Sequence, residues 1–153
     1  MDLAGKVAFV TGGSGDIGRA IAEAFSAAGA QILITGKSEQ DVETCTADLP
    51  PSSTIKARAM DVTSPAEIAG ILRQLGRLDV LVNAAGTIQR AGREFEPEGF
   101  AEVIDVNLVG TMRVSTAASE LLFASRGCII VRWSVTRCFV SMTIAPPTNT
   151  AEL

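Results

Sequence analysis

The chain contains no tyrosine and no histidine among its 153 residues, so neither side chain is available to move a proton. Basic residues form no run, and the net charge of -4 argues against a broad nucleic-acid surface. No apolar run approaches the roughly 20 residues that span a bilayer. The cysteines Cys45, Cys128 and Cys138 lack metal-ligand spacing, so we expect reduced thiols and no metal. Small molecules are therefore the expected partners, with no nucleic acid and no membrane.

The length suits one domain with a real core. Hydrophobic residues make up 47% of the chain and charged residues 20%, which argues against disorder over most of its length. The N-terminal segment MDLAGKVAFV begins with an acid and lacks the basic and apolar regions of a secretory signal. We therefore expect a cytoplasmic protein.

Strand patterns alternate with helix patterns along the sequence. Apolar runs typical of buried strands occupy residues 7–10, 31–35, 54–62, 78–86 and 127–131, and helical patterns occupy 17–28, 38–49, 64–75 and 97–125. This alternation predicts an α/β fold, a doubly wound parallel sheet of about five strands with helices on both faces. Beyond Val131 the pattern loses definition.

Two of the predicted helices allow more detailed expectations. Ser64, Pro65 and Glu67 form a helix-start signature. The buried stripe that should follow consists of Ile68, Ile71, Leu72 and Leu75. In the long helix over 97–125, the residues expected to face inward are Phe100, Val103, Ile104, Leu108 and Met112.

A glycine-rich segment, TGGSGDIG, follows the first predicted strand and opens the first predicted helix. Two registers fit, GxGxxG and TGxxGxxG, and both use Gly15 and Gly18. Glycines let the backbone approach a pyrophosphate, whose charge then meets the positive end of the helix. The segment predicts a dinucleotide site that includes Thr11, Gly12, Gly13, Ser14, Gly15, Ile17 and Gly18.

Four motifs in order resemble the short-chain dehydrogenase/reductase family: TGGSGDIG, Asp61-Val62, LDVLVNAAG and DVNLVG. The resemblance covers about residues 3–135 and is nearest to members related to gluconate and deoxygluconate dehydrogenases. It implies a Rossmann-type dinucleotide-binding domain over 1–135, followed by an aberrant or disordered tail over 136–153. Asp16 replaces a glycine of the commoner family pattern, and its carboxylate either repels the pyrophosphate or caps the helix.

The resemblance also implies how the cofactor is held. Lys37 would face a 2′-phosphate with Ser38 as a hydrogen-bond donor, which favours NADP(H) over NAD(H); a solvated surface lysine is the alternative. Asp61 and Val62 would flank the adenine ring, and Asn83 would tie neighbouring strands together. The remaining residues expected to make room for the cofactor are Ala84, Ala85 and Gly86.

The catalytic residues implied by the resemblance are incomplete. Asn107 matches the asparagine of a proton relay, and Ser134 matches the serine that orients the substrate. At the family's spacing from Ser134, the tyrosine and lysine positions fall on Pro147 and Ala151. Proline and alanine side chains carry no ionisable group. We therefore expect a truncated relative that is catalytically inactive.

Several functions remain open at this point. The first is NAD(P)-dependent hydride transfer to or from an alcohol or ketone, with a sugar acid or polyol as substrate because Arg90 matches a basic residue in the gluconate branch. The alternatives are a fragment similar to 3-oxoacyl carrier-protein reductases and a non-catalytic NADP(H)-binding module. A frame change near Val131 would leave no function at all. The fifth strand is expected to form an exposed edge, which invites homo-oligomerisation or aggregation.

Overall fold

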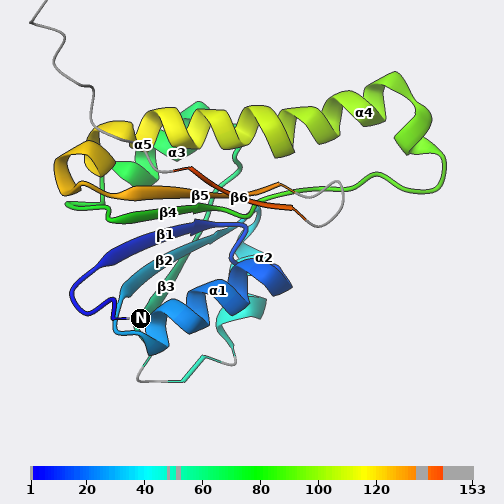
Figure 1. The fold of residues 1–153 in the computed structure, drawn as a ribbon. Coiled ribbons are helices and arrows are strands. Elements are labelled where there is room, and N and C mark those ends of the chain that lie inside the picture. The colour runs from blue at the N-terminus through cyan, green and yellow to red at the C-terminus, as the bar shows by residue number, and fades with distance from the viewer. Residues whose placement is uncertain (1, 48, 51–52, 134–137, 143–153) are drawn as a thin grey trace, which may run out of the picture.

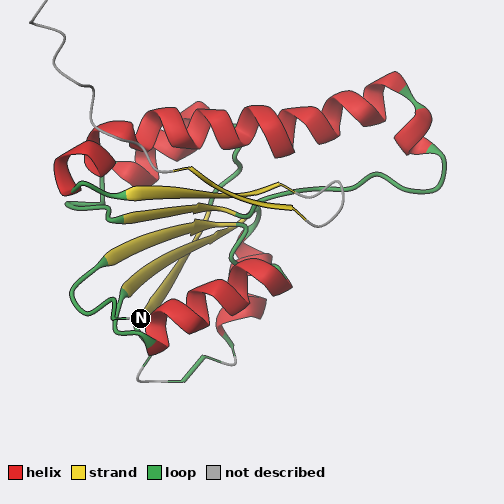
Figure 2. Cartoon of the chain, viewed as in Figure 1, coloured by secondary structure: helices red, strands yellow, loops and turns green. Residues whose placement is uncertain are grey.

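The computed structural model describes residues 2–47, 49–50, 53–133 and 138–142. Within these residues one sheet is covered by helices on both faces (Figures 1 and 2). The strands are β1 (Val7–Thr11), β2 (Gln31–Gly36), β3 (Ile55–Ala59), β4 (Val80–Asn83), β5 (Cys128–Trp133) and β6 (Cys138–Met142). The helices are α1 (Asp16–Ala27), α2 (Glu39–Thr46), α3 (Pro65–Leu72), η1 (Arg93–Phe95), α4 (Pro97–Ile104), η2 (Asp105–Gly110) and α5 (Thr111–Ser125).

The sheet has the strand order β3-β2-β1-β4-β5-β6. Strands β1 to β5 are parallel, which confirms the predicted α/β sheet. Strand β6 adds to β5 in antiparallel register, with Ile129 opposite Met142 and Trp133 opposite Cys138. The expectation that β5 would be an exposed edge is therefore wrong, because β6 takes up the backbone groups on that side. The proposed division at residue 135 stays a prediction.

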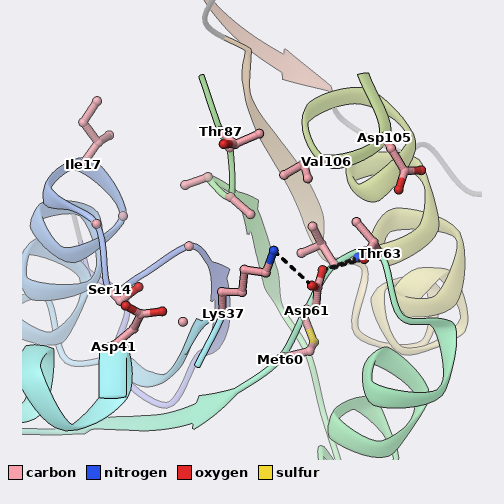
Figure 3. Close-up of a pocket in the computed structure, with 18 of the residues that line it drawn as sticks. Ser14, Ile17, Lys37, Asp41, Met60, Asp61, Thr63, Thr87, Asp105 and Val106 are labelled. Carbon is pink, nitrogen blue, oxygen red and sulfur yellow. Dashed lines mark hydrogen bonds and ion pairs between the residues drawn. The ribbon is translucent and has the colours of Figure 1, made fainter. Parts of the chain in front are cut away.

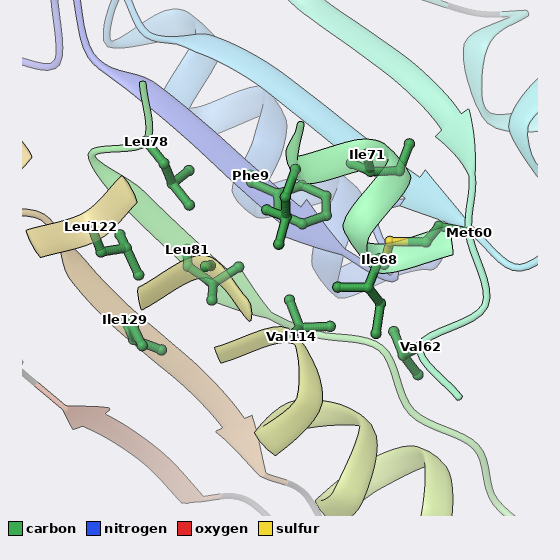
Figure 4. Packing of buried hydrophobic residues seen from close by; sticks show 12 residues of the cluster. Phe9, Met60, Val62, Ile68, Ile71, Leu78, Leu81, Val114, Leu122 and Ile129 are labelled. Carbon is green, nitrogen blue, oxygen red and sulfur yellow. The ribbon is translucent and has the colours of Figure 1, made fainter. Parts of the chain in front are cut away.

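The core consists of two clusters, one on each face of the sheet. Helices α3 and α5 cover one face, where Phe9, Leu81, Val114 and Leu122 are almost fully buried (Figure 4). Helix α1 covers the other face, where Val10 and Ile34 belong to the second cluster. Because both faces are covered, the central strands β1 and β4 are buried, as their continuous apolar runs predict.

The long helical region over 97–125 is continuous, but its buried face differs from the prediction. Phe100, Leu108 and Met112 are 61%, 46% and 65% exposed, so the prediction that they point inward is wrong. Val114, Ala118 and Leu122 make the buried stripe of α5. Two features explain the difference. Helix α4 projects beyond the strands (Figure 1), and the π-helical turn η2 changes the helical phase that sequence periodicity assumes.

Helix α3 begins where predicted and fixes the end of β3. Ser64 Oγ accepts a long hydrogen bond of 3.4 Å from Glu67 N, and Pro65 is the first helical residue. The Glu67 carboxylate turns back to accept from Asp61 N at 2.8 Å. The start of α3 therefore anchors Asp61. None of the helices in the described part of the chain has the length and apolar character needed to span a bilayer.

Candidate functional site

The strand order reverses at β1, which lies between β2 and β4. In open α/β sheets a crevice forms at the carboxyl ends of the strands on either side of such a reversal. Here a cleft of about 790 Å³ lies at that position (Figure 3). Its lining comes from the turn after β1, the ends of β2 and β3, the loop after β4 and the α4–η2 region.

Most of the predicted cofactor residues meet in this cleft. Those that line it are Gly12, Ser14, Gly15, Ile17, Gly18, Lys37, Asp61, Val62, Ala84, Ala85 and Gly86. Thr11, Gly13, Ser38 and Asn83 are not part of the lining. The lining residues that sequence reasoning missed are Gly36, Asp41, Met60, Thr63, Thr87, Gln89, Glu102, Asp105 and Val106. Gly36 is the last residue of β2 and Met60 directly follows β3, so strand alignment could have indicated them.

The glycine turn is packed too tightly for side chains at Gly12, Gly13 and Gly18, and at Gly13 the added Cβ would strike the Ile34 side chain. Gly12 has a φ of +65°, and a Cβ there would lie 2.5 Å from Ala85 Cα. A Cβ at Gly18 would lie 2.3 Å from Gly12 O. These contacts join the turn to the loop after β4 and to the first turn of α1. Glycine is needed here for packing, whatever the cleft binds.

Gly15 differs because space is open around it. A Cβ at Gly15 would meet only Gly12 O, at an ordinary 3.5 Å. Gly15 is the N-cap of α1, and no side chain caps this end of the helix. The first-turn N–H groups of α1, which have no intrahelical acceptor, therefore face a cleft that a ligand can enter. Asp16 is the first residue of α1 and makes no side-chain cap, so the capping alternative does not apply.

Thr11 and Asn83 hold the walls of the cleft from behind. Thr11 Oγ1 accepts from both Ala84 N and Ala85 N at 3.2 Å. Asn83 Nδ2 donates to Ser115 Oγ at 3.0 Å, which ties β4 to α5 rather than to a neighbouring strand. The loop after β4 is thus positioned by strand-end polar groups, and small side chains leave its cleft side open.

Lys37 and Asp61 face each other across the cleft. Lys37 Nζ lies 3.5 Å from Asp61 Oδ2, although the Lys37 side chain is 75% exposed (Figure 3). Asp61 Oδ1 also accepts from Thr63 N and Thr63 Oγ1, both at 2.8 Å. Burial acts to raise the pKa of Asp61, but the hydrogen bonds from Thr63 and the charge of Lys37 together hold that pKa below its ordinary value. Asp61 is therefore an ionised hydrogen-bond acceptor at neutral pH.

The cleft has an acidic lining. Among the described residues that line it, Lys37 is the one basic side chain, whereas Asp16, Asp41, Asp61, Glu102 and Asp105 are acidic. An anionic ligand would therefore depend on main-chain N–H groups and on Lys37. Because the chain contains no tyrosine and no histidine, neither a phenol nor an imidazole is available in the cleft to transfer a proton.

Asn107 lies in the π-helical turn η2 and is fully engaged with the loop after β4. Its Oδ1 accepts from Thr87 N at 2.8 Å, and its Nδ2 donates to Thr87 O at 3.0 Å. This pair of bonds fixes the outer wall of the cleft. Arg90 is exposed and does not line the cleft. Ser134, Pro147 and Ala151 lie outside the described residues.

The described residues contain no group of three histidine, cysteine or acidic side chains that could hold a metal ion. Cys45 and Cys128 do not provide thiolate ligands either, because burial raises the pKa of both thiols and keeps them protonated. The strand order and the position of the cleft are those of a Rossmann-type α/β fold.

Comparison with known proteins specifies the class further. The family model described as short chain dehydrogenase matches residues 6–147. The chain is 36% identical over 141 residues to the 3-oxoacyl-[acyl-carrier-protein] reductase FabG of Escherichia coli (strain K12), covering 88% of this chain and 57% of that protein. The chain belongs to the short-chain dehydrogenase family.

Two solved structures share the fold. The crystal structure of gox2181 aligns with a TM-score of 0.79 at 27% identity, covering 92% of this chain and 60% of that one. The structure of a putative gluconate dehydrogenase from Agrobacterium tumefaciens aligns with a TM-score of 0.74 at 34% identity, covering 84% of this chain and 53% of that one. In sequence, the chain is also 33% identical to the peroxisomal 2,4-dienoyl-CoA reductase of Mus musculus, covering 88% of this chain and 48% of that protein. The chain thus spans about half the length of these relatives.

Proposed function

We propose that this chain binds a nicotinamide dinucleotide in the cleft at the carboxyl end of the sheet, with NADP(H) preferred over NAD(H). The observation that supports this proposal is the continuous lining from the open N-terminus of α1, past Lys37 and Asp61, to the small residues Ala84–Gly86. The pyrophosphate would lie at Gly15, where main-chain N–H groups are accessible. Lys37 would exchange its Asp61 partner for the 2′-phosphate.

We further propose that the bound cofactor is not turned over by this chain alone. When bound, a nicotinamide supplies hydride transfer to or from an alcohol or ketone. The chain has no tyrosine anywhere, and spacing from Ser134 puts Pro147 and Ala151 at the family's tyrosine and lysine positions. The proposed role is an oxidoreductase relative in which residues 1–135 hold the cofactor.

The relatives support two proposed substrate classes. A sugar acid or polyol is our first choice, supported by the 34% identity to a putative gluconate dehydrogenase structure. A 3-oxoacyl thioester is the second, supported by the 36% identity to a 3-oxoacyl-[acyl-carrier-protein] reductase. A turnover assay of this chain with both classes is expected to give no cofactor-dependent rate. Robust turnover with either class would overturn the proposed inactivity.

The binding proposal is tested with a matched pair of glycine substitutions. Gly15→Ala puts a methyl group in open space over the N-terminus of α1, so the fold should remain while dinucleotide affinity drops by about tenfold or more. Gly70→Ala, in α3, adds a methyl group with nothing within 4 Å and should leave affinity unchanged. Calorimetric titration with NADPH and NADH measures both. Equal affinities for the two variants, or no saturation of the parent chain at about 1 mM cofactor, would contradict the proposal.

A further inference from the structure

Asp41 shares the outer end of the cleft with the end of β2 and the glycine turn. A Cβ at Gly36 would lie 2.9 Å from Ser14 Oγ and 3.0 Å from Asp41 Cβ, so these three residues are closely packed. Figure 3 shows Asp41 beside Ser14, on the opposite side of the cleft from Asp61. Lys37 extends away from Asp41 toward Asp61. A carboxylate therefore lies at the end of β2 without an ion pair to Lys37.

The position of Asp41 is set by a reciprocal cap at the start of α2. Asp41 Oδ2 accepts from Ser38 N at 3.0 Å and from Ser38 Oγ at 2.8 Å. In return, Asp41 N donates to Ser38 Oγ at 3.2 Å. Both Ser38 donors thus point to the Asp41 carboxylate. An incoming phosphate could use Ser38 only by breaking this cap.

The end of β2 consequently carries opposing groups. Lys37 attracts a 2′-phosphate, but it is paired with Asp61, and Asp41 adds a second negative charge at the same end of the cleft. An acid beside the end of the second strand can accept hydrogen bonds from an unphosphorylated ribose and repels a ribose phosphate. In this chain α2, rather than β2 itself, supplies that acid.

Resting on the proposed dinucleotide binding, we infer that Asp41 determines how strongly this site discriminates between NADP(H) and NAD(H). Asp41 opposes Lys37, so the parent site accepts both dinucleotides with a limited preference. Discrimination is a difference between two binding free energies, and a carboxylate that repels only one of the ligands changes that difference directly. Asp41 is a specificity-determining residue and takes no part in proton transfer.

The test compares the dinucleotide affinities of Asp41→Asn with those of Glu39→Gln, a control that removes the same amount of charge. Asparagine keeps an acceptor for Ser38 N, so α2 should keep its cap, which a thermal melt can verify. Asp41→Asn is expected to tighten NADPH binding by about threefold to tenfold and leave NADH binding unchanged or weaker. Glu39→Gln removes a charge from the same first turn, outside the cleft lining, and should leave the affinity ratio unchanged.

Salt dependence provides a second readout. The effect of Asp41→Asn should shrink as ionic strength rises, because a repulsion between exposed charges is screened, whereas a change of cleft shape would persist. Asp41→Ser serves in the same way if the asparagine variant does not fold. An affinity ratio that stays within about twofold of the parent in the folded variant would overturn this inference while leaving dinucleotide binding intact. Failure of the parent to bind either dinucleotide would overturn both.

Discussion

Replacing Asp79 by asparagine removes the charge that joins the start of β1 to the start of β4. The Asp79 side chain is 4% exposed, and it accepts from Val7 N at 3.0 Å. Arg77 donates to it twice, from Nε at 2.8 Å and from a terminal nitrogen at 2.7 Å. Lys6 Nζ donates at 3.2 Å. Asparagine can retain only part of this set, because its amide nitrogen is a donor.

The lowered pKa of Asp79 gives the size of its contribution to folding stability. Hydrogen bonds from Arg77 lower its pKa most, burial opposes them, and Val7 N and Lys6 lower the pKa further, from 3.8 to about 2. That gap corresponds to about 2 kcal/mol of folding stability. Lys6 and Arg77 are 45% and 54% exposed, so solvent screening reduces the contribution to about 1–2 kcal/mol. Because the folded pKa is depressed, this stability is present above pH 3.8 and is lost as pH falls toward 2.

Urea unfolding of the parent and of Asp79→Asn at two pH values checks this reasoning. At about pH 6 the variant should be less stable by about 2–3 kcal/mol, since hydrogen bonds to a charged acceptor are lost. At about pH 2.5 the difference should shrink by about 1 kcal/mol, because protonation removes much of the parent's advantage. Glu23→Gln, at an exposed pair with Arg19, is the control and should cost under about 0.5 kcal/mol. A parent-to-variant difference that is equal at both pH values would refute the assigned role of ionised Asp79.

Four further substitutions probe the packing of the cleft and helices. In urea unfolding, Leu122→Ala should lower the free energy of unfolding by about 2–5 kcal/mol, because Leu122 is only 1% exposed. Met112→Ala should lower it by less than about 0.5 kcal/mol, because Met112 is 65% exposed. Similar losses for the two variants would contradict the described buried face of α5. Gly18→Ala should cost about 1–3 kcal/mol by the same measurement because its methyl group would strike main chain, and an unchanged midpoint would refute that contact. Asn107→Ala should cost about 1–2 kcal/mol and increase hydrogen exchange at the Thr87 amide; unchanged exchange would contradict the clamp.

Sequence patterns predicted the elements that depend on local or strongly periodic signals. The apolar runs located β1 to β5, and the Ser64-Pro65 signature located the start of α3. The glycine segment was placed correctly between β1 and α1, and most of its residues line the cleft. These predictions succeed because strand burial, helix starts and tight turns are encoded by neighbouring residues.

The failures share a physical cause. Periodicity identified an apolar stripe through Phe100, Leu108 and Met112, but α4 extends beyond the sheet and η2 shifts the helical phase. Strand β6 was missed because an edge strand that pairs with β5 needs no regular alternation of its own. In each case the missing information was which surface the element would meet, and local sequence does not specify that surface.

The amino-acid sequence was enough to establish the family, the α/β order of elements and the glycine turn between β1 and α1. Which charges share the cleft became apparent only from the three-dimensional arrangement. Lys37 meets Asp61 because β2 and β3 align in parallel and end together, and Asp41 enters the cleft because its cap on Ser38 turns the start of α2 toward Gly36. Electrostatic preference depends on distances between charges, and only folding brings these residues close enough to act on one ligand.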